Sequence, residues 1–436
     1  MKNISVLILV FSALLTMTAI AQHIDEPYEI GDWKDFKTAA ISYTFDDNYP
    51  KQLDVVVPMF NEFGYKLTLF TFTNAWNSAN WEKLSEAVEQ GHEIGSHTAT
   101  HNNLSEMNDD QQLEELAGSK ETIEENIPGY KVHTIAYPFC VAGNNDLTRQ
   151  YYIAARGCSG QIVPQTPSNF MDISSMIIGS EGFETSEALN GRADAAVSSG
   201  GWAVFLVHGL DGEGGYSELA SEEIQGNLEY MADNDSNFWV GSFGNVFKYL
   251  RERNAASVNE ISADENKIEV ELTDTLDNSM YDHPITIRRL IPQDWDSVTV
   301  WQDTLLLKSR IIETGEGKRV QFNAIPDSGL IIIEKAMATS NEFSATDKAE
   351  TFNLIRNYPN PFNPSTNIVF EVRKTGLITI EVYNTLGKKI ETLFNEVSNP
   401  GTYTVKWDAR EYVSGTYLYR YETDDISTTG KMILIK

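Results

Sequence analysis

Five side chains that can bind a metal ion or transfer a proton lie in three short segments of the first half of the chain. Thr44-Phe45-Asp46-Asp47 carries two adjacent carboxylates, His97 and His101 are four residues apart, and His208 follows an apolar run. Zinc accepts imidazole nitrogen and carboxylate oxygen, and a position left to water makes such a site hydrolytic. One carboxylate and two imidazoles would hold a divalent ion, and the other carboxylate and imidazole would move protons.

The spacing of these residues also allows simpler interpretations. Two histidines four residues apart face one ion if the backbone between them is helical, yet many such pairs bind nothing. An isolated Asp-Asp pair often caps a following helix, and a histidine at a strand end is often only hydrogen-bonded. Neighbours on a strand face opposite ways. We therefore expect the chain to bend at Asp46-Asp47, where Asn48 and Pro50 favour a turn.

The elements that would position these residues alternate between apolar strands and helices from residue 39 to 254. We expect strands at 39–45, 66–72, 132–136, 153–156, 202–207 and 238–240, and helices at 50–63, 81–90, 109–125, 221–233 and 246–253. This alternation predicts parallel strands with helical crossovers, in a β/α barrel or a doubly wound sheet. In barrels, functional groups gather where strands end, and the Asp46-Asp47 pair, Pro138 and His208 all follow predicted strands.

From about residue 256 the pattern changes to short alternating strands. They are expected at 267–272, 285–290, 297–301, 320–322 and 330–334. We assign residues 22–255 to the barrel, 256–337 to an all-β sandwich, 338–350 to a polar linker and 351–436 to a second all-β domain. The expected fold class is thus multidomain, with a distorted β/α (TIM-like) barrel followed by two β-sandwich domains.

Composition and the N-terminus indicate an exported protein. Residues 1–21 are typical of a signal peptide, with Lys2, an apolar run at 4–15 and Ala19-Ile20-Ala21 as the cleavage signal. The sequence has no second long apolar stretch, so we expect no transmembrane segment. The chain has 63 acidic and 33 basic residues and a net charge of −30, which argues against nucleic-acid binding. Export permits a disulfide between Cys140 and Cys158, but two reduced thiols are equally compatible with the sequence.

On these motifs, residues 38–254 resemble the polysaccharide deacetylase (NodB-homology) domain of carbohydrate esterase family four. The family's Thr-Phe-Asp-Asp motif matches Thr44 to Asp47. The resemblance implies a distorted β/α barrel with one divalent metal ion, in which Asp46 is the general base. Asp47, His97 and His101 are then the metal ligands.

Two further motifs of the family have counterparts in the chain. The resemblance implies that Leu206 lines the pocket for the acetyl methyl group and that His208 is the general acid. Ala136-Tyr137-Pro138-Phe139 matches the third motif, in which the N–H of Phe139 would help to bind the oxyanion. Many members have an arginine at the position of Ala136, and Arg156 is a possible substitute for orienting the base.

The chain departs from the family's pattern in two other features. Asn48 replaces the usual glycine after the Asp pair. The fourth motif has no convincing counterpart, and Asp172 is only a weak candidate for it.

Residues 351–436 resemble the C-terminal sorting domain of type IX secretion substrates, a small Ig-like sandwich. The resemblance rests on the turn motif from Asn357 to Thr366 and on the terminal strand Lys431-Met432-Ile433-Leu434-Ile435-Lys436. It implies passage through the outer membrane by the type IX machinery, followed by release or surface attachment.

The sequence thus predicts a secreted or surface-exposed, metal-dependent polysaccharide deacetylase. Metal-bound water would attack an N- or O-linked acetyl group of an extracellular or cell-wall glycan, with Asp46 as base and His208 as acid. The ion is expected to be zinc, with cobalt, nickel or manganese as alternatives. Two other functions stay open: a non-haem iron enzyme, because two histidines and one carboxylate also suit ferrous iron, and a non-catalytic surface glycan-binding protein.

Overall fold

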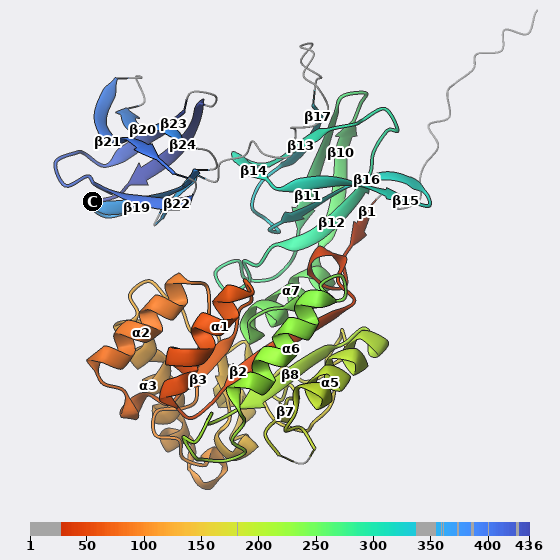
Figure 1. Cartoon of the computed structure of the whole chain (residues 1–436), viewed down its shortest axis with the longest axis vertical. Coiled ribbons are helices and arrows are strands. Elements are labelled where there is room, and N and C mark those ends of the chain that lie inside the picture. Colours follow the sequence, from red (N-terminus) through yellow and green to blue (C-terminus); the bar gives the residue numbers. More distant parts are fainter. Residues whose placement is uncertain are drawn as a thin grey trace, which may run out of the picture. The chain divides into compact units, whose positions relative to one another are not determined.

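The computed structural model describes residues 28–180, 182–336, 355–358, 360, 362–372, 375–384, 388–399, 401–423 and 427–436. The expected signal peptide (1–21) and linker (338–350) lie outside the described residues. The chain forms two compact units, Met1–Met337 and Ala338–Lys436 (Figure 1). The first unit holds a parallel sheet with helices and a region of antiparallel sheets, and the described residues of the second form two antiparallel sheets.

A curled parallel sheet forms the centre of the first part of the chain. Its order is β6-β5-β4-β3-β2-β8-β7, and β9 pairs with the start of β2. The strands are β2 (Ala39–Phe45), β3 (Thr68–Thr71), β4 (Glu93–Ser96), β5 (Thr134–Ala136), β6 (Ala154–Arg156), β7 (Met176–Ile177), β8 (Trp202–Val207) and β9 (Phe238–Val240). Ile173 forms a parallel bridge with Arg156 of β6, and β7, which begins three residues later, pairs with β8. The segment from Ile173 to Ile177 therefore links the two ends of the sheet. The expected parallel β/α sheet is confirmed.

Helices lie around the outside of the curled sheet (Figure 1). They are α1 (Val57–Glu62), α2 (Ser78–Glu89), α3 (Asp109–Asn126), α4 (Asn145–Thr148), α5 (Ser186–Ser199), α6 (Ser221–Asp233) and α7 (Phe243–Ala255). Asn77 and Asn108 begin α2 and α3 with reciprocal capping boxes, which satisfy amide N–H groups that have no partner within the helix. The single helix expected at 50–63 is instead a π-helical turn, Gln52–Val56, followed by α1.

The residues of β2 alternate between two buried environments. Ile41, Tyr43 and Phe45 belong to the hydrophobic cluster between the sheet and the helices. Ala40 belongs to a second cluster, together with Val204 of β8 and other residues on the concave side of the sheet. Because side chains alternate along a strand, Ser42, Thr44 and then Asp46 continue the inward series. This alternation brings a carboxylate into the barrel at the carboxyl end of β2.

The region after α7 forms two antiparallel sheets, with strand orders β1-β12-β16-β15 and β10-β11-β17-β13-β14. Their strands are β1 (Tyr28–Ile30), β10 (Ser257–Ala263), β11 (Lys267–Thr273), β12 (Ile285–Leu290), β13 (Val298–Gln302), β14 (Leu305–Leu307), β15 (Ser309–Thr314), β16 (Gly317–Ala324) and β17 (Ile331–Lys335). Both sheets contribute to one hydrophobic cluster, which also contains Tyr249 of α7. Strand β1 precedes the barrel in sequence but pairs with β12, a partnership that the sequence did not reveal.

The second unit has two antiparallel sheets, with orders β18-β19-β22 and β21-β20-β23-β24. Its strands are β18 (Ile355–Tyr358), β19 (Ser365–Val372), β20 (Gly376–Asn384), β21 (Lys389–Ser398), β22 (Gly401–Asp408), β23 (Gly415–Glu422) and β24 (Ser427–Leu434). Ile368, Ile380, Trp407 and Leu434 are buried in their shared cluster. The C-terminal basic–apolar segment is therefore a paired strand of this unit.

Candidate functional site

The carboxyl end of β2 turns sharply, as the two adjacent carboxylates require. Asp47 and Asn48 adopt left-handed backbone conformations, with φ of 70° and 61°. Asn48 tolerates this region better than most residues, and its Nδ2 donates to the Phe72 carbonyl at 2.8 Å while its Oδ1 accepts from Thr71 at 2.6 Å. The turn that we expected at Asp46-Asp47 is present. It directs both carboxylates toward the site.

The two histidines four residues apart do not lie on a helix. His97 directly follows β4, and the segment to His101 is a loop in which Thr98 and His101 have φ of 66° and 61°. The helical backbone that would bring both histidines to one ion does not form here. The loop nevertheless directs both rings to the same place. Buried Glu115 of α3 holds the loop, because its Oε2 accepts the N–H groups of Ala99 at 2.9 Å and Thr100 at 2.8 Å.

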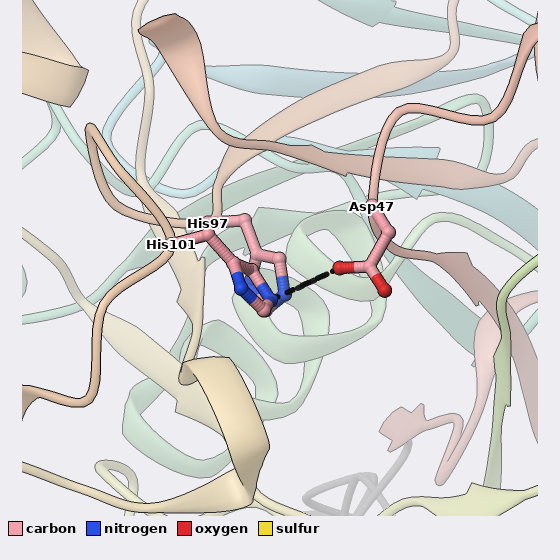
Figure 2. Close-up of side chains that lie close together, drawn as sticks. All are labelled: Asp47, His97 and His101. Atoms are coloured by element: carbon pink, nitrogen blue, oxygen red, sulfur yellow. Dashed lines mark ion pairs between the residues drawn. The ribbon is translucent and has the colours of Figure 1, made fainter. Parts of the chain in front are cut away.

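Asp47, His97 and His101 bring one potential ligand atom each to within 4.8 Å of the others. Figure 2 shows both imidazoles turned toward the Asp47 carboxylate, whose Oδ1 lies 3.0 Å from Nε2 of His101 and 3.4 Å from Nε2 of His97. Nδ1 of His97 is 2.8 Å from the Ala136 carbonyl oxygen, which leaves its Nε2 available to a metal ion.

The geometry of these three atoms fits a metal ion. A tetrahedral zinc ion with bonds of about 2.0–2.1 Å holds neighbouring ligand atoms roughly 3.3 Å apart. Asp47 Oδ1 is buried and accepts no properly aligned hydrogen bond within the described part of the chain, despite its two close nitrogens. Lone pairs that converge without an aligned proton between them suit a shared cation. The sequence-predicted triad is therefore assembled in the structure.

Asp46 is 2% exposed and pairs with Arg156 inside the barrel. Its Oδ2 lies 2.6 Å from Nη2 of Arg156, whose Nη1 donates to Thr44 Oγ1 at 3.2 Å. Asp46 Oδ1 is buried and has no hydrogen-bond partner among the described residues. Arg156 thus contacts one carboxylate oxygen of the expected base, and its role as a substitute for the family's usual arginine stays a prediction.

His208 lies on the other side of the Asp47 carboxylate, with its Nε2 4.0 Å from Oδ2. Gln52 connects it to Asp46, because Nε2 of Gln52 donates to the Asp46 carbonyl at 2.5 Å and to the His208 carbonyl at 3.1 Å. Nδ1 of His208 is buried without a partner in the described chain. Asp172, the candidate for the fourth motif, is exposed and makes no described contact with His208.

Phe139 and Leu206 lie at the carboxyl ends of β5 and β8. Phe139 has φ of 57°, and its amide N–H makes no hydrogen bond within the described residues, so it is free to bind an anion. Leu206 is 1% exposed and follows the inward alternation of Val204. A disulfide joins Cys140, next to Phe139, to Cys158, two residues after Arg156. The choice between a bridge and free thiols is thereby decided.

Charge and burial set the protonation of the site. Burial alone would raise the pKa of Asp47, but the adjacent His101 and His97 outweigh it and hold that pKa well below its usual range. The Asp47 carboxylate in turn raises the pKa of His101. Burial lowers the pKa of His208, against the pull of Asp46 and Asp47. The pKa values of His101 and His208 are thus shifted in opposite directions.

Comparison with known proteins identifies two domains of the chain. Residues 34–155 match the family model for polysaccharide deacetylase, and residues 356–436 match that for the secretion system C-terminal sorting domain. The chain carries a polysaccharide deacetylase domain and a type IX sorting domain. The sorting domain indicates secretion. No described helix of the protein is long and apolar enough to cross a membrane.

The chain is similar to a curated protein and to several solved structures. A gellan lyase from Bacillus sp is 30% identical over 329 residues, which cover 70% of this chain but only 13% of that protein. The Xyl-CE4 domain of a multidomain xylanase from the hindgut metagenome of Trinervitermes trinervoides is 20% identical, with 48% of this chain and 90% of that one covered and a TM-score of 0.36. The peptidoglycan deacetylase PdaC from Bacillus subtilis is 14% identical, with coverage of 50% and 93% and a TM-score of 0.36.

Sequence reasoning missed three residues of the site. Glu115 and Gln52 act on backbone groups, and nothing in their sequence context distinguishes them from other polar helical residues. Tyr216 packs edge-on against His208, with ring centroids 5.4 Å apart. The one signal in the sequence was that Tyr216 directly follows the glycine-rich segment from Gly209 to Gly215.

Proposed function

We propose that the chain is a secreted, metal-dependent polysaccharide deacetylase that removes N- or O-linked acetyl groups from an extracellular or cell-wall glycan. One observation carries the proposal: Asp47 presents Oδ1 to His97 and His101 and Oδ2 to His208. A metal site and a potential proton donor thereby share one carboxylate. The deacetylase family match supports a carbohydrate substrate and hydrolytic chemistry.

Asp47, His97 and His101 would hold one divalent ion, with zinc as the first candidate and cobalt, nickel or manganese as alternatives. When bound, such an ion supplies Lewis acidity and lowers the pKa of water to about 7. Asp46 would accept the proton of the attacking water through its free Oδ1. Arg156 fixes the orientation of that carboxylate by holding Oδ2.

The remaining steps are assigned to residues on the neighbouring strand ends. The free N–H of Phe139 would donate to the oxyanion that forms from the acetyl carbonyl. Leu206 would contact the acetyl methyl group at the inward face of β8. Protonated His208 would donate to the departing amine or alcohol, and the burial that lowers its pKa makes it a stronger acid.

The rest of the chain would deliver and accompany the catalytic domain. We assign residues 1–21 to a signal peptide and 351–436 to an Ig-like sorting domain that the type IX machinery reads, which would place the protein outside the cell or on its surface. Residues 256–337 would form an accessory β-sandwich, joined to the sorting domain by the linker at 338–350. The acidic surface makes nucleic acid an unsuitable partner.

Acetate release tests this function. Purified protein is incubated with acetylated chito-oligosaccharides and with acetylated xylan, before and after removal of metal by a chelator. We expect metal-dependent acetate release from at least one of the two substrates. In Asp46→Asn the rate of acetate release should fall roughly 100-fold or more, while the metal content stays unchanged. Loss of metal in Asp46→Asn would overturn the division of roles between Asp46 and Asp47.

Each alternative gives a distinct result in the same assay. Turnover that requires oxygen would indicate the iron enzyme. Glycan binding without acetate release from any substrate would indicate a binding protein.

A further inference from the structure

Exposed apolar side chains of the deacetylase region are concentrated near the site. In the described part of residues 28–255, the large hydrophobic side chains with high exposure are Phe139 at 64%, Val141 at 36% and Tyr216 at 60%. Phe139 and Val141 follow β5, and Tyr216 lies in the segment after β8. Single exposed apolar residues are ordinary, but their restriction to the carboxyl end of the sheet indicates a binding surface.

The two aromatic rings flank the site on different sides. The Phe139 ring lies 4.9 Å from the His101 ring, and the Tyr216 ring lies 5.4 Å from the His208 ring at an interplanar angle of 89°. His101 faces Oδ1 of Asp47, whereas His208 faces Oδ2. Tyr216 therefore lies on the side of the expected proton donor, where the leaving group of the reaction would be.

The segment that carries Tyr216 has an unusually constrained backbone. Five of its residues have left-handed φ angles: Asp211, Gly212, Gly214, Gly215 and Ser217. Glycine adopts such angles without steric cost, but Asp211 and Ser217 keep them only where the surroundings impose them, and strained residues of this kind cluster at functional sites.

Two carboxylates impose this conformation by accepting backbone N–H groups. Glu213 accepts from Lys51 at 2.9 Å and from Leu210 at 3.0 Å. Glu218 accepts from Gly214 at 2.9 Å and also from Gly212. The segment also packs tightly against Tyr49, since a Cβ at Gly215 would lie 1.7 Å from the Tyr49 hydroxyl. The backbone thus holds an exposed tyrosine in place before any ligand binds.

We propose that Tyr216 is a specificity-determining residue that stacks on the sugar ring bearing the acetyl group, on the His208 side of the site. This inference rests on the proposed deacetylase function. A pyranose ring has an apolar C–H face and a polar rim, and a tyrosine that is apolar on its face and polar at its tip suits both. The net charge of −30 favours a neutral glycan over a polyanionic one.

Binding of products tests the stacking without any need for turnover. Chitotetraose and xylotetraose are titrated calorimetrically into the metal-loaded full chain, its Tyr216→Ala and Tyr216→Phe variants, and Leu305→Ala. Leu305 is a matched exposed apolar control at 63% exposure in β14. We expect the Kd of one of the sugars to be roughly 3- to 10-fold higher for Tyr216→Ala than for wild type. For Tyr216→Phe and Leu305→Ala, the Kd of that sugar should stay within twofold of the wild-type value. Equal binding by Tyr216→Ala, or no binding of either sugar to wild type, would overturn the proposal.

Kinetics separate stacking from an effect on His208. Stacking predicts that Tyr216→Ala raises KM for acetylated chitotetraose or xylotetraose by the same factor, with kcat and hydrolysis of p-nitrophenyl acetate nearly unchanged. An equal loss of kcat on both kinds of substrate would show that Tyr216 acts through His208 and would contradict the proposal. If wild type releases no acetate but Tyr216→Ala still weakens sugar binding, the proposed function fails and the stacking surface stands.

Discussion

At the scale of single residues, Asp46 and Arg156 form a buried ion pair within the site. Both side chains are almost fully buried, and their closest atoms are 2.6 Å apart. The guanidinium also lies 5.3 Å from the Phe70 ring centroid. Removing one partner of a buried pair leaves the other charge without compensation, which costs about 3–5 kcal/mol.

This pairing predicts different outcomes for two substitutions of Arg156. Arg156→Met should reduce kcat about 100-fold and the free energy of unfolding by about 3 kcal/mol, because the buried Asp46 carboxylate loses its guanidinium partner at 2.6 Å. Arg156→Lys keeps the charge but loses the planar fork, so kcat should fall about 10-fold with a smaller loss of stability. Steady-state kinetics and urea unfolding measure both. A kcat within twofold of wild type in Arg156→Met would refute the positioning role.

The sequence predicted these residues because their side chains carry recognisable chemistry in family motifs. Asp46, Asp47, His97, His101 and His208 converge in the structure as expected. Gln52 and Glu115 escaped prediction because their partners are backbone groups that only the fold brings near. The sequence suggested that Arg156 could substitute for the arginine missing at Ala136, and the fold places Arg156 next to Asp46.

At the scale of elements, loops set the site, and their shapes were the least predictable part. The expected strands and most helices are present, since their apolar periodicity is strong. The segment from His97 to His101 is a loop because Glu115 satisfies its amide N–H groups from α3. Helix α5 was not expected, because its small and polar residues give little apolar periodicity.

The role of Glu115 can be tested on helix α3. Glu115→Ala removes the acceptor for the amide N–H groups of Ala99 and Thr100, in the loop that carries both histidine ligands. Metal affinity should fall roughly 10- to 100-fold, as is typical for groups that orient metal ligands. The control is Glu114→Ala, the exposed neighbour on the same helix. Competition with a chelator measures affinity, and equal affinity in the two variants would contradict the account.

The Cys140–Cys158 disulfide joins the Phe139 segment to the chain after Arg156. It closes a loop with a sequence separation of 18 residues, for which the loop-entropy model gives about 3 kcal/mol of stabilisation. The Cys140→Ser/Cys158→Ser double variant should lose about this much in urea unfolding. Reductant should destabilise wild type but not the double variant. Insensitivity of wild type to reductant would show that the bridge contributes nothing.

At the scale of the whole molecule, the deacetylase region and the following antiparallel sheets share buried contacts. Strand β1 pairs with β12, and Tyr249 of α7 donates to the Gly31 carbonyl at 2.8 Å. Glu252 of α7 is fully buried and accepts the N–H of His283 at 2.9 Å, while its second oxygen has no partner among the described residues. Burial raises the pKa of Glu252 to about 8.

This raised pKa predicts how stability depends on pH. Between pH 4.5 and about 8 the folded chain keeps a proton on Glu252 that the unfolded chain releases. The stabilisation is therefore complete below pH 4.5 and is lost as pH rises through 8. Urea midpoints of wild type should fall from pH 6 to pH 9 more steeply than those of Glu252→Gln. Parallel profiles for the two proteins would contradict burial of this acid.

The most direct test of the whole account is the metal content of the purified protein and three of its variants. We predict close to one transition-metal ion per chain in wild type and in Asp46→Asn, and almost none in Asp47→Asn or His97→Ala after the same dialysis. Elemental analysis by mass spectrometry gives these values without any assumption about the substrate. A wild-type protein that retains no metal ion, or an Asp47→Asn variant that retains a full equivalent, would contradict the central claim that Asp47, His97 and His101 form one metal site.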